Sequence, residues 1–216
     1  MTGFTDRTHR AADGTTSRYA VFAPSGADRP PVVLFLHGAG AVGTDGRSHL
    51  TGGLAPAVRR KPDFPCLTVF PQAQSRDRGW LADGPDGRRA VAILDEVLAA
   101  APHDPKRVYL SGLSMGGHRV WSLAAAHPAR WAAIVPLCHG GEPADAPKLK
   151  DIPRWCVHGD ADRTVPVGSS RAMIRAVRAA GGQPIYQEYA GVDHNCWDRA
   201  YADPDLWEWL LLQKRK

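Results

Sequence analysis

The chain has 216 residues, of which 44% are hydrophobic and 23% charged, a balance typical of a folded globular domain and too apolar for a disordered protein. No apolar run approaches the ~18 residues that a membrane span needs, and the polar start MTGFTDRTHR lacks the apolar core of a secretory signal, so we expect a cytoplasmic protein. The net charge of +5 is scattered, and the cluster Arg171, Arg175 and Arg178 indicates a solvated helix face, which argues against nucleic-acid binding.

Short apolar segments alternate with segments of helical periodicity along the chain. Strands are predicted at residues 18–24, 32–36, 66–70, 108–110, 132–137, 154–157 and 185–189, the first pairing with the stretch before it. Helices are predicted at residues 50–60, 88–101, 117–126, 169–180 and 204–212. This alternation predicts one α/β domain over residues 1–216, with a mainly parallel sheet and helices on both faces. Active residues are then expected at the carboxyl ends of strands.

The segment SGLSMGG at residues 111–117 contains the pattern G-x-S-x-G, centred on Ser114. An apolar strand precedes it and an apolar-periodic helix follows, which is the strand–turn–helix context of an activated serine. Gly112 and Gly116 leave room for a tight turn, in which the serine is strained and its hydroxyl exposed near the positive end of the helix dipole. The pattern predicts Ser114 as a nucleophile; the alternative is a glycine-rich turn with a capping serine.

A serine hydroxyl needs a base to remove its proton. In this type of fold the order along the chain is serine, acid, histidine, and His194 is the one histidine beyond residue 158. The acid is expected in HGDADRTVP, where Asp160 and Asp162 compete. We favour Asp162 because it lies further along the loop, whereas Asp160 is placed to brace the turn. Asp162 would fix the tautomer of His194 and stabilise the imidazolium that forms.

A tetrahedral intermediate needs two N–H groups aimed at its negative oxygen. One is expected from the amide of Met115, directly after the nucleophile. The second is expected from the loop HGAGAVG at residues 37–43, through the amide of Ala39, because glycines let the backbone approach closely. His37 is expected to fix this loop by hydrogen bonds and to take no part in proton transfer.

Three further side chains are candidates for contact with a substrate. Trp80 and Trp197 either line the acyl or alcohol side or serve as packing residues, and Gln72 either touches the substrate or the oxyanion loop. About sixteen residues separate Leu137 from Arg154, too few for the cap domain that is commonly inserted there. We therefore expect an open cleft, which permits bulky or polymeric esters.

Metal and cofactor chemistry is disfavoured by spacing. The cysteines at positions 66, 138, 156 and 196 form no CxxC pair, and no spacing indicates a particular disulfide. His139 and His158 end predicted strands, but no H-x-H or H-E-x-x-H spacing occurs. We expect neither a metal nor a cofactor.

Five segments carry a resemblance over nearly the whole chain: FLHGAGAVGTD from position 35, PQA from 71, VYLSGLSMGGHRVW from 108, HGDADRTVPV from 158 and EYAGVDHNCWDRAY from 188. They resemble small single-domain α/β-hydrolases, in the region of dienelactone hydrolase-like proteins, phospholipase/carboxylesterases, feruloyl esterases, polyhydroxybutyrate depolymerases and a bacterial group labelled "predicted peptidase". The resemblance implies Ser114 as nucleophile, Asp162 as acid and His194 as base, without a cofactor. Dienelactone hydrolase itself carries cysteine where Ser114 stands.

The residues and the resemblance together favour a serine carboxylester hydrolase that acts through an acyl-enzyme on short-chain acyl or hydroxycinnamoyl-type aryl esters. The alternatives are a serine peptidase, a phospholipase or a polyester depolymerase with the same three residues. An alternative of another class is a binding module that retains the hydrolase fold without catalysis.

Overall fold

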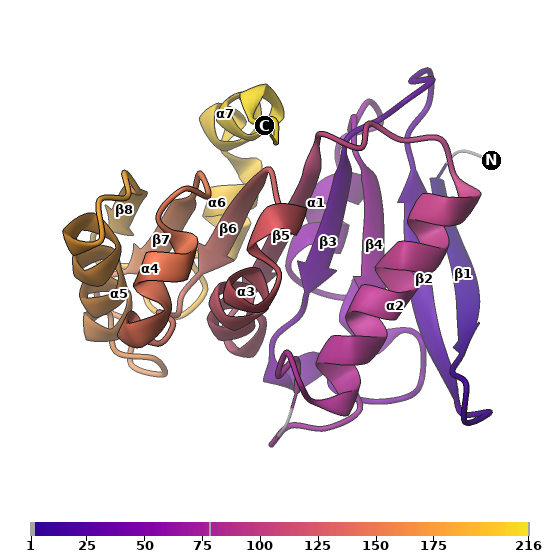
Figure 1. Cartoon of the computed structure of the whole chain (residues 1–216), viewed down its shortest axis with the longest axis horizontal. Helices are drawn as coiled ribbons and strands as arrows, with labels where there is room; N and C mark the ends of the chain where they lie inside the picture. Colours follow the sequence, from indigo (N-terminus) through magenta and orange to yellow (C-terminus); the bar gives the residue numbers. More distant parts are fainter. Residues whose placement is uncertain (1–2, 78, 216) are drawn as a thin grey trace.

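The computed structural model describes residues 3–77 and 79–215, which form an eight-stranded sheet with helices on both faces (Figure 1). The strands are β1 (Gly3–Arg10), β2 (Thr16–Ala23), β3 (Val32–Leu36), β4 (Leu67–Pro71), β5 (Val108–Leu113), β6 (Ala133–Leu137), β7 (Trp155–Gly159) and β8 (Ile185–Tyr189). Their order across the sheet is β1-β2-β4-β3-β5-β6-β7-β8. β2 runs antiparallel to both of its neighbours, and the pairs from β4–β3 to β7–β8 are parallel.

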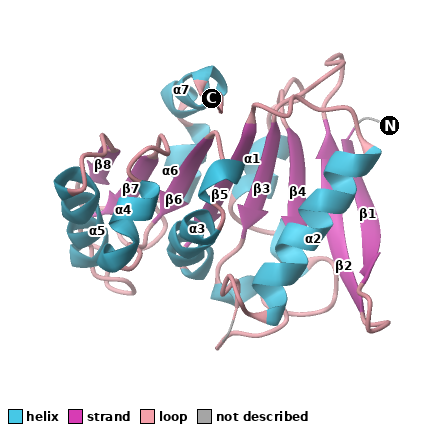
Figure 2. Ribbon diagram, viewed as in Figure 1, coloured by secondary structure: helices cyan, strands magenta, loops and turns pink. Residues whose placement is uncertain are grey.

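The helices divide between the two faces of the sheet. They are α1 (Leu54–Arg59), α2 (Pro85–Ala100), α3 (Met115–Ala126), α4 (Ala146–Leu149), α5 (Gly168–Ala179), α6 (Trp197–Ala202) and α7 (Pro204–Leu212). Figure 2 shows α2, α3, α4 and α5 in front of the sheet, where their buried residues join one apolar cluster, while those of α1, α6 and α7 join a second cluster on the other face. Because crossovers between parallel strands are right-handed, α1, which leads from β3 to β4, lies on the opposite face from α2 to α5, which lead in the other direction along the sheet.

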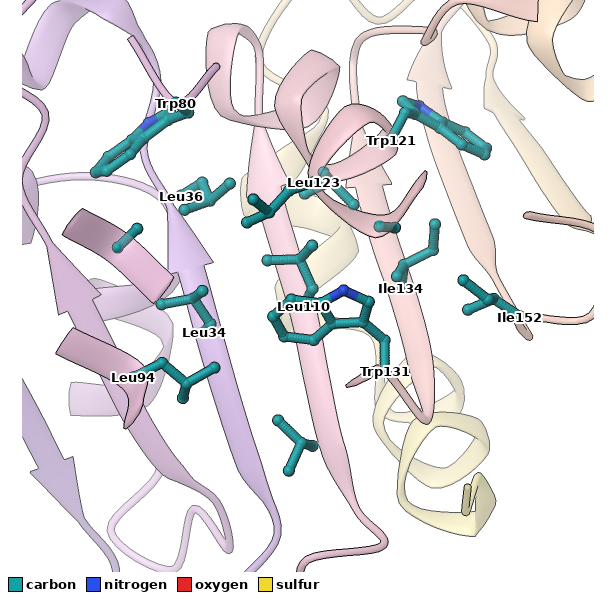
Figure 3. Packing of buried hydrophobic residues seen from close by; sticks show 14 of the residues in the cluster. Leu34, Leu36, Trp80, Leu94, Leu110, Trp121, Leu123, Trp131, Ile134 and Ile152 are labelled. Carbon is teal, nitrogen blue, oxygen red and sulfur yellow. The ribbon is translucent and has the colours of Figure 1, made fainter. Parts of the chain in front are cut away.

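The alternation of side chains along β3 explains why this strand is apolar throughout. Leu34 and Leu36 pack into the cluster beneath α2 and α3, whereas Val33 and Phe35 pack into the cluster beneath α1 and α6. Figure 3 shows Leu34, Leu36 and Leu110 meeting on the first face. Each fully buried leucine stabilises the fold by about 1.5–3 kcal/mol relative to exposure. A strand of five consecutive apolar residues is therefore stable only where both of its faces are covered, in the middle of the sheet.

The predicted elements are found with shifted ends. β5 continues to Leu113 because the polar Ser111 is tolerated in the core, its hydroxyl lying 2.8 Å from that of Tyr201. Two short helices, α4 and α6, were not predicted, since four to six residues give too little periodicity. The segment between β6 and β7 holds only α4 and a short 3₁₀ turn, so no separate cap domain covers the carboxyl edge of the described sheet.

Within residues 3–77 and 79–215, every helix is too short or too polar to cross a membrane. All four cysteines are buried and carry free thiols.

Candidate active site

The turn that carries Ser114 is too tight for side chains at the neighbouring glycines. Ser114 has φ 54° and ψ −121°, a backbone conformation that costs a non-glycine residue about 1–3 kcal/mol. A Cβ atom at Gly112 would lie 2.8 Å from the carbonyl oxygen of Leu36, and one at Gly116 would overlap that same oxygen. Both positions therefore require glycine, as the G-x-S-x-G pattern indicates, and β3 packs directly against the turn.

Three side chains from different loops form one hydrogen-bonded chain. Nε2 of His194 lies 2.9 Å from Oγ of Ser114, and Nδ1 of His194 lies 2.7 Å from Oδ2 of Asp162. Ser114, Asp162 and His194 follow β5, β7 and β8, so the carboxyl ends of parallel strands bring them to one edge of the sheet. When Nδ1–H donates to the carboxylate, the Nε2 lone pair is free to accept the serine proton. This arrangement can activate a serine hydroxyl as a nucleophile.

The Asp162 carboxylate is buried and accepts hydrogen bonds on both oxygens. Oδ1 accepts from the amides of Thr164 and Val165, each at 2.8 Å. Burial by itself raises the pKa of this carboxyl, but the hydrogen bonds from His194 and from the two amides outweigh burial and hold its pKa below the usual value. Asp162 is therefore an anion at neutral pH and can stabilise a positive charge on His194.

Asp160, the alternative acid, lies outside this chain of contacts. Its side chain is exposed, and Oδ1 accepts a hydrogen bond from the amide of Gly191 at 2.7 Å. This bond ties the end of β7 to the loop after β8. The geometry thus gives Asp160 the bracing position and Asp162 the position beside His194.

A second histidine, His158, also contacts Asp162. It lies in β7 with an exposure of 0%, and its Nε2 is 3.1 Å from Oδ2 of Asp162 and 3.0 Å from the carbonyl oxygen of Val165. Burial lowers the pKa of His158. From the sequence, His158 was a candidate only for metal binding. Its place at the end of a buried strand, four residues before Asp162, is the signal that could have predicted the contact.

Two backbone amides near Ser114 have no hydrogen-bond acceptor among the described residues. The amide of Met115 is free because Met115 is the first residue of α3, where helical N–H groups have no intrahelical acceptor. The amide of Ala39 is free at the start of the 3₁₀ turn η1 (Ala39–Ala41), and Ala39 lines the same cavity as Ser114. Paired free amides of this kind can bind a developing oxyanion.

His37 holds the loop that carries Ala39. Its Nδ1 lies 2.7 Å from the carbonyl oxygen of Gly38, and its Nε2 accepts from the amide of Ala73 at 3.0 Å. Burial lowers the pKa of His37 to about 4, so the ring is neutral and the tautomer is fixed with the proton on Nδ1. The expected hydrogen-bonding role of His37 is therefore found in the structure.

Two of the three residues predicted to contact substrate are instead buried supports of the same loop. Trp80 is 0% exposed, its ring packs edge-on against that of His37, and its Nε1 donates to the carbonyl oxygen of His37 at 2.9 Å. The prediction that Trp80 contacts substrate is wrong, because the indole lies beneath the loop. Gln72 is 2% exposed, and its Nε2 donates to the carbonyl of Ala41 at 3.1 Å while its Oε1 accepts from the amide of Gly46 at 2.9 Å. Gln72 thus contacts the loop, the second of its two predicted roles, and its assignment to the substrate is wrong.

A cavity of about 380 Å³ opens beside Ser114 and His194. Trp197 lines it, as predicted, and stands edge-on to the ring of His194 with 5.4 Å between centroids. The apolar side chains of Phe35 and Leu113 contribute to its wall from β3 and β5. Sequence reasoning missed these two and several other lining residues, which come from separate segments: His49, Thr51, Gly52 and Thr164. The cavity combines the Ser114 hydroxyl at one side with a largely apolar surface.

Among residues 3–77 and 79–215, no group of three or more His, Cys, Asp or Glu side chains is placed to hold a metal ion.

No protein-family model matches the chain. A curated protein of Nocardia uniformis subsp. tsuyamanensis, "Putative esterase NocK", is 28% identical over an alignment of 187 residues that covers 79% of this chain and 52% of that protein. The solved structure of a thermostable esterase superposes with a TM-score of 0.89 at 29% identity, covering 98% of this chain and 63% of that one. The chain adopts the α/β-hydrolase fold.

A feruloyl esterase module from Clostridium thermocellum shares this α/β-hydrolase fold, with a TM-score of 0.71 at 14% identity over 92% of this chain and 84% of that one. The fold and the resemblance to esterases inferred from the motifs are therefore confirmed. The chain spans 52% of the length of NocK and 63% of that of the thermostable esterase. Because the chain covers only part of these two proteins, its activity is inferred below from the geometry of its own site.

Proposed function

We propose that the chain is a serine carboxylester hydrolase. Oγ of Ser114 attacks the acyl carbonyl carbon while Nε2 of His194 takes the hydroxyl proton, and the amides of Ala39 and Met115 bind the resulting oxyanion. The tetrahedral intermediate collapses when the C–O bond to the alcohol breaks and the alkoxide takes the proton from His194. Asp162 stabilises the imidazolium between these two proton transfers.

The acyl group then remains on Ser114 as an ester. A water molecule gives a proton to His194 and attacks the acyl carbon, and the second tetrahedral intermediate releases the acid and returns the proton to Ser114. Each turnover consumes one ester and one water, and produces one acid and one alcohol, without a cofactor. The observation that carries this proposal is the unbroken hydrogen-bonded chain, 2.9 Å and 2.7 Å, that begins at a strained serine.

We infer small acyl or aryl esters, including hydroxycinnamoyl esters, as the substrate class. The cavity of about 380 Å³ has the size of a small-ligand site, and Phe35, Leu113 and Trp197 give it an apolar and aromatic surface. The absence of a cap over the described carboxyl edge supports access by bulky esters. An ester is the easier substrate because its leaving alkoxide needs less acid assistance than an amine.

The test compares turnover of p-nitrophenyl acetate with that of peptide p-nitroanilides, using the full chain and a Ser114→Ala variant. We expect ester hydrolysis by the full chain, loss of nearly all of it in the variant, and little anilide cleavage. Cleavage of anilides without hydrolysis of the ester would indicate a peptidase. Equal turnover by the full chain and the variant would overturn the proposal.

The substrate class is tested with a panel of p-nitrophenyl esters of increasing acyl length, together with methyl ferulate and a polyester. We expect kcat/KM to be highest for short acyl or aromatic acyl esters. A maximum for long acyl chains would contradict the inferred class.

A further inference from the structure

One oxygen of the Asp162 carboxylate is shared between two histidines. Oδ2 lies 2.7 Å from Nδ1 of His194 and 3.1 Å from Nε2 of His158. The first contact belongs to the proposed reaction, and the second takes no part in any of its proton transfers. His158 and Asp162 are both closed off from solvent, since their side chains have exposures of 0%.

The contacts of the His158 ring fix its protonation state. Nε2 faces two acceptors, the Asp162 carboxylate and the carbonyl of Val165 at 3.0 Å, so this nitrogen carries a hydrogen. Nδ1 lies 2.7 Å from the hydroxyl of Ser170, a residue of α5 that is 0% exposed. Because burial lowers the pKa of His158, the ring is neutral and Nδ1 accepts the proton of the Ser170 hydroxyl.

The charged and titratable groups that face His158 come from several elements. Asp162 and His194 lie in the loops after β7 and β8, Glu188 lies in β8 and His139 follows β6. Glu188 is paired with Arg171 at 2.7 Å, and burial lowers the pKa of His139 to about 4. The negative charges favour protonation of His158, but burial outweighs them.

We propose that His158 is a positioning residue for the reaction of Ser114, a role that rests on the proposed function. Its neutral ring donates a hydrogen bond to the same carboxylate oxygen that His194 uses. The amides of Thr164 and Val165 hold the other oxygen, so among the described residues His194 and His158 are the two side chains that contact Oδ2, and His158 fixes this oxygen independently of the base.

A neutral donor suits this position better than a cation. A guanidinium or ammonium group at the same distance would place a full positive charge beside the carboxylate and weaken its attraction for the imidazolium of His194. The N–H of a neutral imidazole orders the oxygen and leaves the negative charge in place. Because His158 is buried in β7 against α5, its lowered pKa keeps the ring neutral at the near-neutral pH at which His194 accepts the serine proton.

The test uses His158→Leu and His158→Gln, whose side-chain amide restores a neutral donor. With p-nitrophenyl acetate, His158→Leu should lower kcat by about tenfold to 100-fold, the range for a lost hydrogen bond to a charged group, and should leave KM within about twofold. His158→Gln should recover most of kcat. In His158→Leu the acid limb of the kcat/KM profile should move to lower pH, because a twisted Asp162 no longer stabilises protonated His194.

His9→Gln is the matched control, since His9 is also a buried histidine that contacts a carboxylate, Glu96 at 2.7 Å, on β1 at the far edge of the sheet. It should leave kcat and the pH profile unchanged. If His158→Leu fails to fold, Ser170→Ala is measured instead. Loss of its hydroxyl should lower kcat and move the acid limb in the same direction.

Unchanged kcat in the folded His158→Leu variant, equal impairment in His158→Gln, or an acid limb that does not move would overturn the positioning role and leave the proposed function intact. An unchanged Ser170→Ala profile would do the same where that variant is used. If the unsubstituted chain does not turn over any ester, both the proposed function and this inference fail.

Discussion

The two sides of Ser114 are built in different ways. On the side of β7 and β8 the site is built from side chains, because Asp162 contacts both His194 and His158. On the side of β3, the backbone amide of Ala39 is available beside that of Met115 at the start of α3, and buried side chains such as His37 and Gln72 hold the loop that presents Ala39. Proton transfer needs titratable groups, whereas oxyanion binding needs only oriented N–H groups. Substitutions should therefore act sharply on the first side and gradually on the second.

The largest effect is expected at the acid. Asp162→Asn should lower kcat on the order of 10⁴-fold, because the amide favours the wrong tautomer of His194 and cannot stabilise its charge. Steady-state kinetics with p-nitrophenyl acetate measures this loss. Asp160→Asn is the control and should cost much less, since the side-chain hydrogen bond of Asp160 found among the described residues is with the backbone amide of Gly191, away from His194. A larger loss of kcat in Asp160→Asn than in Asp162→Asn would show that Asp160, and not Asp162, is the acid.

The loop side should respond more gently. Gln72→Leu removes hydrogen bonds to Ala41 and Gly46, so the amide of Ala39 should be less well oriented. We expect kcat to fall by about tenfold, less than the 10²–10³ reported for removal of a whole oxyanion donor, with KM little changed. Gln74→Ala, which removes one contact to Ser17, serves as the control. A loss comparable to that of Asp162→Asn would contradict the comparison of the two sides.

The cavity should distinguish substrates by size through Gly52. A Cβ atom at Gly52 meets nothing within 4 Å, so no packing contact requires glycine there, yet Gly52 lines the cavity. Gly52→Leu should lower kcat/KM for methyl ferulate by about tenfold or more through a steric clash, and should spare p-nitrophenyl acetate. Gly168→Leu is the control, because Gly168 is equally unobstructed and lies at the start of α5. If Gly52→Leu leaves the ratio of kcat/KM for methyl ferulate to kcat/KM for p-nitrophenyl acetate unchanged, the feruloyl group does not bind beside Gly52.

The smallest effect concerns stability in acid. Burial lowers the pKa of His37, His49 and His139 from 6.5 to about 4. Between these two values the unfolded chain binds protons that the folded chain does not, so stability is lost as the pH falls from about 6.5 toward 4. Each histidine contributes at most about 1.4 kcal/mol per pH unit in that window. Urea unfolding at pH 7, 6 and 5 measures the slope.

His49 offers a specific check of that slope. Neither ring nitrogen of His49 makes a hydrogen bond of good geometry within the described residues, and the backbone of Phe70 offers only a weak interaction, so His49→Phe removes a titrating group at little cost in hydrogen bonding. The variant should be less sensitive to acid than the unsubstituted chain. An unchanged slope would show that His49 is protonated in the folded state.

The same contrast decides what could be predicted from the sequence. The side-chain half was accessible, because Ser114, Asp162 and His194 each follow a recognisable strand in a fixed order. In the loop half, the sequence predicted the support by His37 but did not decide the role of Trp80, since nothing local distinguishes a buried tryptophan from one that lines a cleft. The contact of His158 with Asp162 was missed because it depends on a loop that folds back on its own strand, which the spacing of four residues indicates but hydrophobic periodicity does not.

The central claim is that the hydroxyl of Ser114 is activated as a nucleophile. A fluorophosphonate probe followed by peptide mass spectrometry tests this directly on the folded chain. One adduct on the peptide that contains Ser114 is expected, and it should be absent in Ser114→Ala. No adduct on the folded chain, or an adduct on a different serine, would contradict the account.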